Sequence, residues 1–331
     1  AGPPFPDGIL IPGKRLSAGS IFQTAPPMFG YYRLASAVPQ LRIADVDYNV
    51  DRLIAGFREA FEKQAAAVVF PELSITGYSC GDLFFQPRLR QAALEGLRRF
   101  TEATEKSGTV AIVGLPFLYG DALYNTAAVV QAGRVLALVA KTMLPNYREF
   151  YEKRQFTSAR ALGTGTREIT VNSAQVPFGT DIVFHDMSSP FSFGVEICED
   201  LWSVIPPSST LALHGARAIL NPSAGTELTG KAAYRRELVK QQSGRCLCAY
   251  ALSSAGVHES TTDVVFGGHC LIADNGRLAA ESARFLRENS LILADVDFER
   301  LAAGRLSESS FNDNKPLPST GEMLHVTLET D

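Results

Sequence analysis

This chain of 331 residues has few cysteines, no excess of basic residues and no long apolar runs. Five scattered cysteines give no disulfide framework, and no paired histidine or cysteine motif indicates a zinc site. A net charge of −4 argues against a nucleic-acid surface. No apolar stretch is long enough to cross a bilayer, and the first residues lack a secretory pattern. We therefore expect a cytoplasmic protein with no membrane, nucleic-acid or metal partner.

Apolar runs alternate with amphipathic segments along the chain. Residues 46–64 and 88–106 repeat apolar side chains at helical spacing, and 231–243 also has a helical pattern. Strand-like runs are YRLASAV, AAAVVF, TVAIVG, NTAAVVQ, RVLALVA, FSFGVEIC, ARAILNPS and SLILADVD. The strings QAGR and DNGR supply hairpin turns. The pattern predicts a mixed α/β fold, and 46% hydrophobic residues suffice for a sizeable core.

Three reactive side chains follow such apolar runs, far apart in sequence. Glu72 lies in VVFPELSITGY, Lys141 in VAKTMLPNYREF and Cys198 in FGVEICEDLW. Strand ends are where α/β folds present chemistry. A thiol can attack an amide carbonyl, a carboxyl group in an apolar cleft can carry the proton, and a lysine can stabilise the oxyanion. The three residue types together favour acyl transfer through a thioester.

The strings that carry these residues also resemble a known family. FPELSITGYS, AKTMLPNYREFYEKRQF and VEICEDLW are similar to the three active-site segments of the nitrilase (carbon–nitrogen hydrolase) superfamily. LPNYREFYEKRQF and HESTTD resemble one branch, the glutaminase domain of glutamine-dependent NAD synthetase. The resemblance runs from about residue 31 to about 314. It implies an αββα sandwich of two mixed β-sheets flanked by helices.

The resemblance also implies roles for the reactive residues. Cys198 is expected to be the nucleophile, and Glu72 the general base and acid. Lys141 is expected to stabilise the tetrahedral intermediate together with the backbone N–H of Glu199. Glu149, eight residues beyond Lys141, matches a second glutamate that orients the lysine and the substrate in many members.

Substrate contacts are implied in the same way. Tyr78 and Tyr147 sit where the synthetase branch lines its pocket, and the Glu199 side chain where that branch meets the α-amino group of the substrate. The branch usually has a serine and an arginine at the positions of Gly225 and Lys231. Lysine lacks the planar fork with which arginine holds a carboxylate, so these two residues leave the identity of the amide open.

The two ends of the chain are less regular than its middle. Residues 1–29 are rich in proline and glycine, and we expect an irregular N-terminal extension there. Residues 30–304 are expected to form the nitrilase-like amidohydrolase (glutaminase) domain. Residues 305–331 are polar and are expected to form a C-terminal tail or linker.

The ATP-dependent domain of the synthetase branch has no counterpart in this sequence. Its pyrophosphate-binding loop would read serine-glycine-glycine-x-aspartate-serine, and no such string occurs. We expect no cofactor for this chain, with ATP and magnesium needed only where a synthetase domain is attached. The resemblance further implies a homo-oligomer.

Three functions remain open at this point. The first is the glutaminase part of an NAD synthetase, which releases ammonia from L-glutamine for a synthetase domain missing from this chain. The second is a free-standing amidase or nitrilase acting on another small amide or nitrile. The third is an idle scaffold, which predicts the loss of a reactive side chain, whereas Glu72, Lys141 and Cys198 are all present.

Overall fold

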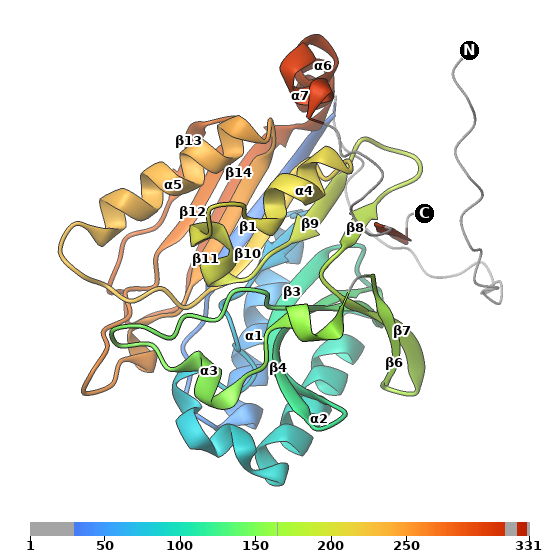
Figure 1. The fold of residues 1–331 in the computed structure, drawn as a ribbon. Helices are drawn as coiled ribbons and strands as arrows, with labels where there is room; N and C mark the ends of the chain where they lie inside the picture. The colour runs from blue at the N-terminus through green and yellow to red at the C-terminus, as the bar shows by residue number, and fades with distance from the viewer. Residues whose placement is uncertain (1–29, 164, 315–322, 330–331) are drawn as a thin grey trace.

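Two mixed β-sheets pack face to face between layers of helices in the computed structural model, which describes residues 30–163, 165–314 and 323–329 (Figure 1). The expected extension over residues 1–29 lies outside these ranges. The first sheet has the order β14 (Ser290–Asp297), β1 (Tyr31–Val38), β2 (Ala67–Val69), β3 (Val110–Tyr119), β4 (Ala122–Gln131), β5 (Arg134–Ala140), β7 (Ala174–Gly179) and β6 (Arg167–Val171). The second has the order β13 (Arg277–Glu281), β12 (Cys270–Asp274), β11 (Ala249–Ser254), β10 (Ala218–Ser223), β9 (Ser192–Val195), β8 (Ile182–His185) and β15 (Leu324–Thr327).

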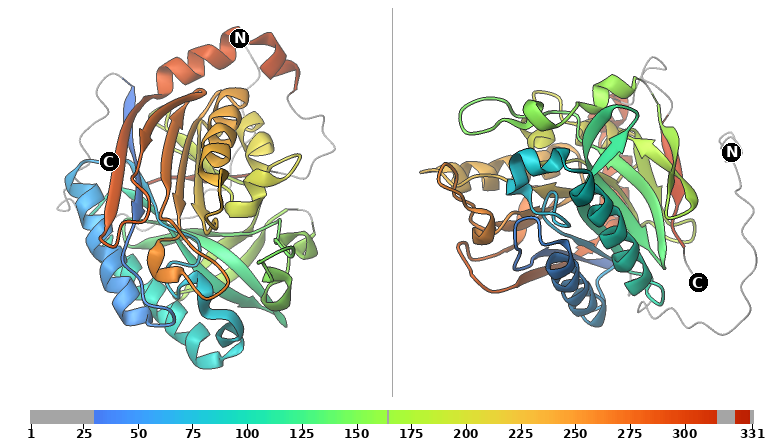
Figure 2. Two further views of the ribbon diagram at one scale, coloured as in Figure 1. Left: turned by 90° about the vertical axis from the view of Figure 1, so that its left-hand side faces the viewer. Right: turned by 90° about the horizontal axis from the view of Figure 1, so that it is seen from below.

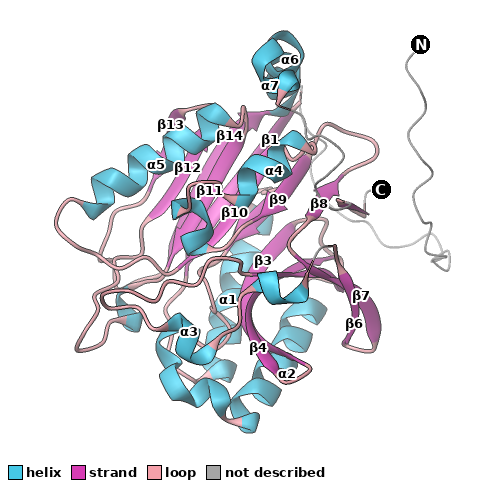
Figure 3. Cartoon of the chain, viewed as in Figure 1, coloured by secondary structure: helices cyan, strands magenta, loops and turns pink. Residues whose placement is uncertain are grey.

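Helices cover the outer face of each sheet, as the two views of Figure 2 show. The α-helices are α1 (Val46–Glu62), α2 (Pro87–Ala103), α3 (Glu152–Gln155), α4 (Pro207–Leu213), α5 (Lys231–Arg245), α6 (Phe298–Ser307) and α7 (Ser309–Asp313). Short 3₁₀ helices are η1 (Tyr78–Phe85), η2 (Ala159–Leu162), η3 (Cys198–Trp202) and η4 (Val257–Glu259). Helices α1 and α2 pack on the first sheet, and α4 and α5 on the second (Figure 3). The expected αββα sandwich is confirmed.

Sequence patterns explain where the long helices begin and what they bury. In α1 the side chains of Val46, Val50, Leu53 and Phe57 recur at helical spacing and are buried against the first sheet. Asp45 caps the helix by accepting a hydrogen bond from the Tyr48 N–H. Helix α2 opens with Pro87, whose missing N–H needs no partner in the first turn. The three helices expected from periodicity are confirmed, with ends that differ by up to three residues.

Both expected hairpins are present, and their backbone conformations explain the sequence at each turn. Ala132 and Gly133 have φ of +49° and +74° between β4 and β5. Asn275 and Gly276 have φ of +47° and +83° between β12 and β13. Two successive positive φ values are the conformation of a type I′ turn, which suits the right-handed twist of paired strands and favours Asn-Gly.

Parts of the segment 305–331, which we expected to be a tail or linker, belong to the sandwich. Strand β15 pairs in parallel with β8 at the edge of the second sheet. The Arg305 side chain is buried and donates to the backbone carbonyls of Ala212, Ala216, Cys246 and Leu247. A buried guanidinium satisfied in this way fastens α6 to the second sheet. Composition did not predict this anchor, because the side chain that makes it is itself polar.

Candidate active site

Strand ends from the two sheets bring the expected reactive residues to one place. Glu72 follows β2 and Lys141 follows β5, both in the first sheet, whereas Cys198 follows β9 in the second. The Glu72 N–H donates to the Ser223 carbonyl at 3.2 Å across the sheets. Ala224 directly follows Ser223 in the chain, and its N–H lies 3.5 Å from the Cys198 Sγ. Packing of the two sheets therefore brings the Glu72 segment close to Cys198.

Lys141 is the centre of a buried ion network beneath the site. Its Nζ lies 2.5 Å from Glu72 Oε1 and 2.7 Å from Glu152 Oε1, and its side chain is 0% exposed. Asn125 donates to Glu72 Oε1 at 2.6 Å, and the Tyr78 hydroxyl donates to Glu152 Oε1 at 2.7 Å. Burial alone would lower the pKa of Lys141, but the two carboxylates outweigh it and hold that pKa well above its ordinary value. The ammonium therefore stays charged.

The second glutamate at the lysine is Glu152, which corrects our expectation for Glu149. The Glu152 N–H donates to the Pro145 carbonyl, and the residue begins α3 with its side chain buried. Glu149 instead accepts a hydrogen bond from Thr226 Oγ1 at 2.8 Å, and Lys231 Nζ donates to the same hydroxyl oxygen at 2.8 Å. Spacing along an irregular loop does not reveal which of two nearby glutamates points inward.

The Cys198 backbone adopts an unusual conformation that the surrounding structure holds in place. Its φ is +46°, in the left-handed region that non-glycine residues seldom occupy. The Cys198 N–H donates to Asn221 Oδ1 at 3.0 Å, and the side chain is 5% exposed. This turn leads directly into η3, whose first N–H groups have no partner within the helix. The Glu199 N–H directly follows Cys198 in this helix. Its role in holding an oxyanion stays a prediction.

The Cys198 thiol is neutral at rest. Burial raises its pKa, and the nearby Glu72 carboxylate raises it further, while Lys141 lowers it. The thiol would therefore have to lose its proton in any attack on a carbonyl group. Glu72 has an oxygen for that proton: Oε1 is held by Lys141 and Asn125, whereas the buried Oε2 has no hydrogen-bond partner among the described residues. We call Glu72, Lys141, Glu152 and Cys198 the catalytic floor.

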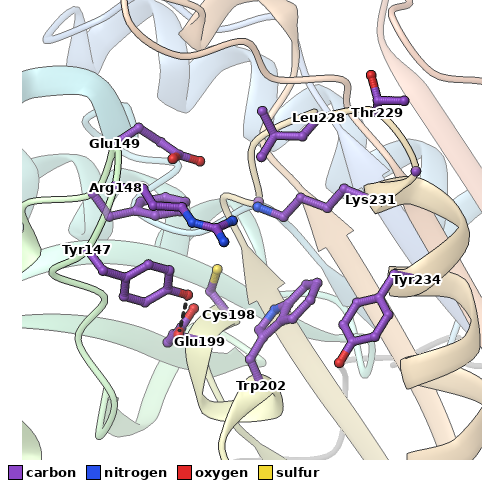
Figure 4. A pocket seen from close by; sticks show the side chains of 13 residues that line it. Tyr147, Arg148, Glu149, Cys198, Glu199, Trp202, Leu228, Thr229, Lys231 and Tyr234 are labelled. Carbon is purple, nitrogen blue, oxygen red and sulfur yellow. Dashed lines mark hydrogen bonds between the residues drawn. The ribbon is translucent and has the colours of Figure 1, made fainter.

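A cavity of about 580 Å³ opens above Cys198 (Figure 4). Its lining includes the expected residues Tyr147, Glu199, Gly225 and Lys231. Tyr147 donates its hydroxyl proton to Glu199 Oε1 at 2.7 Å. Burial raises the pKa of Glu199, opposed by that hydrogen bond. Tyr78, which we also expected in the pocket, does not line this cavity. Its hydroxyl instead donates a hydrogen bond to Glu152 in the floor.

Gly225 has a steric reason to be a glycine. A Cβ atom there would lie 3.3 Å from the guanidinium of Arg235. That guanidinium is 1% exposed and donates to Glu227 and to the Thr226 carbonyl. A side chain at position 225 would therefore press on the group that supports the cavity wall.

Sequence patterns missed four residues of the site. Glu152 and Asn125 hold the floor, while Arg148 and Trp202 line the cavity. In Figure 4 the Arg148 and Lys231 head groups point into the space above the Cys198 sulfur. Arg148 directly follows Tyr147, an expected pocket residue, and has a φ of +51°. No sequence pattern predicts this backbone conformation. We call Tyr147, Arg148, Glu149, Glu199 and Lys231 the rim.

Other kinds of site receive no support from the described ranges. No group of three or more His, Cys, Asp or Glu side chains is placed there to hold a metal ion. None of the helices there is long and apolar enough to cross a membrane.

The αββα sandwich defines the class of enzymes that hydrolyse carbon–nitrogen bonds. The chain belongs to the carbon–nitrogen hydrolase family, whose pattern matches residues 33–306. An amidase from Nesterenkonia sp. AN1, at 19% identity and a TM-score of 0.64, shares the fold over 86% of this chain and 98% of its own.

Similar proteins point to one branch of that family. Residues of this chain are 40% identical over 288 positions to the glutamine-dependent NAD(+) synthetase of Mycobacterium bovis, covering 86% of this chain and 42% of the relative. The corresponding protein of Xanthomonas campestris is 34% identical over 77% of this chain. A glutamine-dependent NAD(+) synthetase structure from Cytophaga hutchinsonii superposes with a TM-score of 0.72 at 29% identity, covering 80% of this chain and 43% of the other. This chain spans less than half the length of these relatives.

Proposed function

We propose that this chain hydrolyses the side-chain amide of L-glutamine, as the glutaminase part of a glutamine-dependent NAD synthetase. The observation that carries the proposal is a buried thiol beneath a cavity whose rim bears both cations and carboxylates (Figure 4). Glutamine combines an amide with a carboxylate and an ammonium group at its far end. The names of the similar proteins support the same substrate.

Lys231 is the proposed anchor for the substrate carboxylate. Its Nζ lies 5.4 Å from the ring centre of Phe150 and 5.6 Å from that of Trp202, and it donates to Thr226. Burial lowers the pKa of Lys231, while the charges of Glu149 and Glu199 oppose that shift. Two aromatic rings and one hydroxyl hold the ammonium group in place. This fixed position compensates for the planar guanidinium that an arginine would supply here.

The other rim residues complete the recognition of a zwitterion. Arg148 adds a second positive charge above the thiol. Glu199, held by the Tyr147 hydroxyl, offers a carboxylate to the α-amino group. Charges of both signs favour an amino-acid amide over a neutral amide or a nitrile, which would leave them unpaired.

Acylation follows from the arrangement of the floor. Glu72 Oε2 takes the thiol proton as Cys198 Sγ bonds to the amide carbon. The Glu199 N–H and the Lys141 ammonium stabilise the oxyanion that forms. Glu72 then gives the proton to the leaving nitrogen, the carbon–nitrogen bond breaks, and ammonia departs from a γ-glutamyl thioester.

Deacylation reverses the roles of the same groups. Glu72 accepts a proton from water as its oxygen attacks the thioester carbonyl, again with the oxyanion held by Lys141 and Glu199. The carbon–sulfur bond breaks, the Cys198 sulfur regains a proton from Glu72, and glutamate is released. This cycle needs neither ATP nor a metal ion.

The released ammonia is proposed to serve an ATP-dependent synthetase domain, which accounts for the greater length of the similar proteins. ATP and magnesium belong to that domain. Assembly into a homo-oligomer stays a prediction.

Ammonia release by the purified chain tests the proposal. We expect release from glutamine, little from asparagine or acetamide, none from a small nitrile, and none at all with Cys198→Ala. Preference for acetamide or the nitrile would instead identify a free-standing hydrolase. An intact Cys198 that turns over none of these substrates, even with a synthetase domain supplied, would contradict the proposal.

A further inference from the structure

One buried carboxylate outside the catalytic floor joins the two segments that carry its key residues. Asp200 is 2% exposed. Its Oδ1 accepts hydrogen bonds from the N–H groups of Thr142 at 3.1 Å and Met143 at 2.7 Å. Its Oδ2 accepts from the Ile197 N–H at 3.0 Å. A single side chain thus holds three backbone donors.

The donors belong to different sheets. Thr142 and Met143 directly follow Lys141 at the end of β5, in the first sheet. Ile197 directly precedes Cys198, which follows β9 in the second. A carboxylate can serve all three donors because each oxygen has two lone pairs and the charge strengthens each bond. A neutral amide of the same shape has only one accepting oxygen.

We propose that Asp200 is a positioning residue, which ties the strand end bearing Lys141 to the turn bearing Cys198 and so sets the thiol against Lys141 and Glu72. The strained backbone of Cys198 needs such support, since φ of +46° persists only where neighbours impose it. Asn221 holds the Cys198 N–H from within the second sheet. Asp200 alone among these contacts reaches across to the lysine.

Its charge state fits this role. Burial raises the pKa of Asp200 to about 6, while the N–H donors of Ile197, Met143 and Thr142 and the charge of Lys141 oppose the shift. The group is therefore ionised at neutral pH and can accept all three bonds.

Alkylation of Cys198 by iodoacetamide tests the proposal without any assumption about the substrate. The rate is measured from pH 6 to 9.5 for the unaltered chain and Asp200→Asn, with the modified cysteine identified by peptide mass. We expect Asp200→Asn to react about tenfold more slowly at pH 7, where proton removal depends on Glu72 and Lys141. Burial raises the pKa of the thiol and keeps it protonated up to pH 9.5, so Asp200→Asn should stay slower over the whole range. Equal rates throughout, beside a lower melting temperature, would reduce Asp200 to a structural role.

Turnover supplies a second readout, which rests on the proposed function. With glutamine, Asp200→Asn should lower kcat about a hundredfold and change KM less than threefold, because the rim is untouched. The matched control is Asp297→Asn, the same change at a carboxylate whose hydrogen bond from the Arg300 N–H at the start of α6 an amide oxygen can still accept. The control should alkylate and turn over as the unaltered chain does.

Two further outcomes are distinguishable. If Asp200→Asn does not fold, Asp200→Glu keeps both acceptor oxygens but displaces them by one bond, and should alkylate at an intermediate rate. A folded Asp200→Glu with the unaltered rate and pH profile would overturn the proposal. A chain that alkylates as expected but releases no ammonia from glutamine would refute the proposed substrate and leave the role of Asp200 standing.

Discussion

The catalytic floor and the rim of the cavity contrast in how their charges are satisfied. In the floor, Lys141 is 0% exposed and binds two carboxylates directly. In the rim, Tyr147 is 50% exposed, and Glu149 and Lys231 meet only through the Thr226 hydroxyl. A buried network loses much when one member is removed, because the others stay buried and unpaired. Changes in the floor should therefore reduce rate and stability, whereas changes in the rim should alter substrate affinity.

Removal of the nucleophile should have the largest effect. Cys198→Ala should lower kcat by roughly 10⁴-fold or more, since no other group can form the thioester. The measurement is steady-state ammonia release at saturating glutamine. Cys80→Ala, at another buried free cysteine, is the control and should keep its activity. Substantial turnover in Cys198→Ala would show that the floor residues do not carry out the reaction.

Removal of the proton carrier comes next. Glu72→Gln keeps the size of the side chain and an oxygen for Asn125 and Lys141, but has no carboxylate oxygen to take the thiol proton. We expect kcat to fall by about 10²- to 10⁴-fold. Iodoacetamide should alkylate Cys198 of this variant more slowly than in the unaltered chain, because the raised pKa leaves the thiol protonated without its base. A variant with near-normal turnover would mean that another group accepts the proton.

The two nearby glutamates allow a direct comparison of floor and rim. Glu152→Gln should lower kcat by roughly 10- to 100-fold and reduce the melting temperature, because Lys141 loses a buried charged partner. Glu149→Gln should leave kcat within about threefold and raise KM several-fold. Kinetics and thermal unfolding of both variants side by side check this. The reverse order would restore the role first expected for Glu149.

Substitution of the rim cation should act on affinity alone. Lys231→Met should raise KM for glutamine about tenfold or more with little change in kcat, because a carboxylate would lose its charged partner. Lys231→Arg keeps the charge and should stay within about threefold of the unaltered KM. Initial rates over a range of glutamine concentrations separate the two parameters. An unchanged KM in Lys231→Met would exclude this residue as the anchor.

A buried carboxyl group beneath the nucleophile should give the smallest effect, on stability. Burial raises the pKa of Glu196 to about 7, with Asp200 adding to the shift and Tyr250 and Ser208 opposing it. The folded state thus binds this proton more tightly than the unfolded chain, so stability falls as pH rises from 5 to 8. Glu196→Gln cannot titrate. The difference between the melting temperature of this variant and that of the unaltered chain should therefore increase by a few degrees from pH 5 to 8. A constant difference would contradict the raised pKa of Glu196.

The residues that the sequence revealed and those that it missed differ for physical reasons. Glu72, Lys141 and Cys198 end buried strands, where apolar runs and one reactive residue are visible in the sequence. Glu152 escaped because its direction depends on the loop between β5 and α3. Asp200 escaped because its partners are backbone N–H groups, which no side-chain pattern reveals.

The same limit applies to the fold. Helices α1 and α2 and the two Asn-Gly-like hairpins follow from local spacing and turn chemistry. Strand β15 does not, because two of its four residues are exposed, two are only partly buried, and all owe their conformation to pairing with β8. Pairing between distant segments is decided by the assembled sheet.

The division of the site between two sheets links catalysis to the order of folding. Apart from β14, which pairs with β1, and the edge strand β15, each sheet draws its strands from one stretch of chain. Glu72 and Cys198 meet only when the two sheets pack on one another. Such contacts between distant segments form late and slowly. The regain of Cys198-dependent turnover during refolding would therefore time the closure of the sandwich, separately from any optical signal for secondary structure.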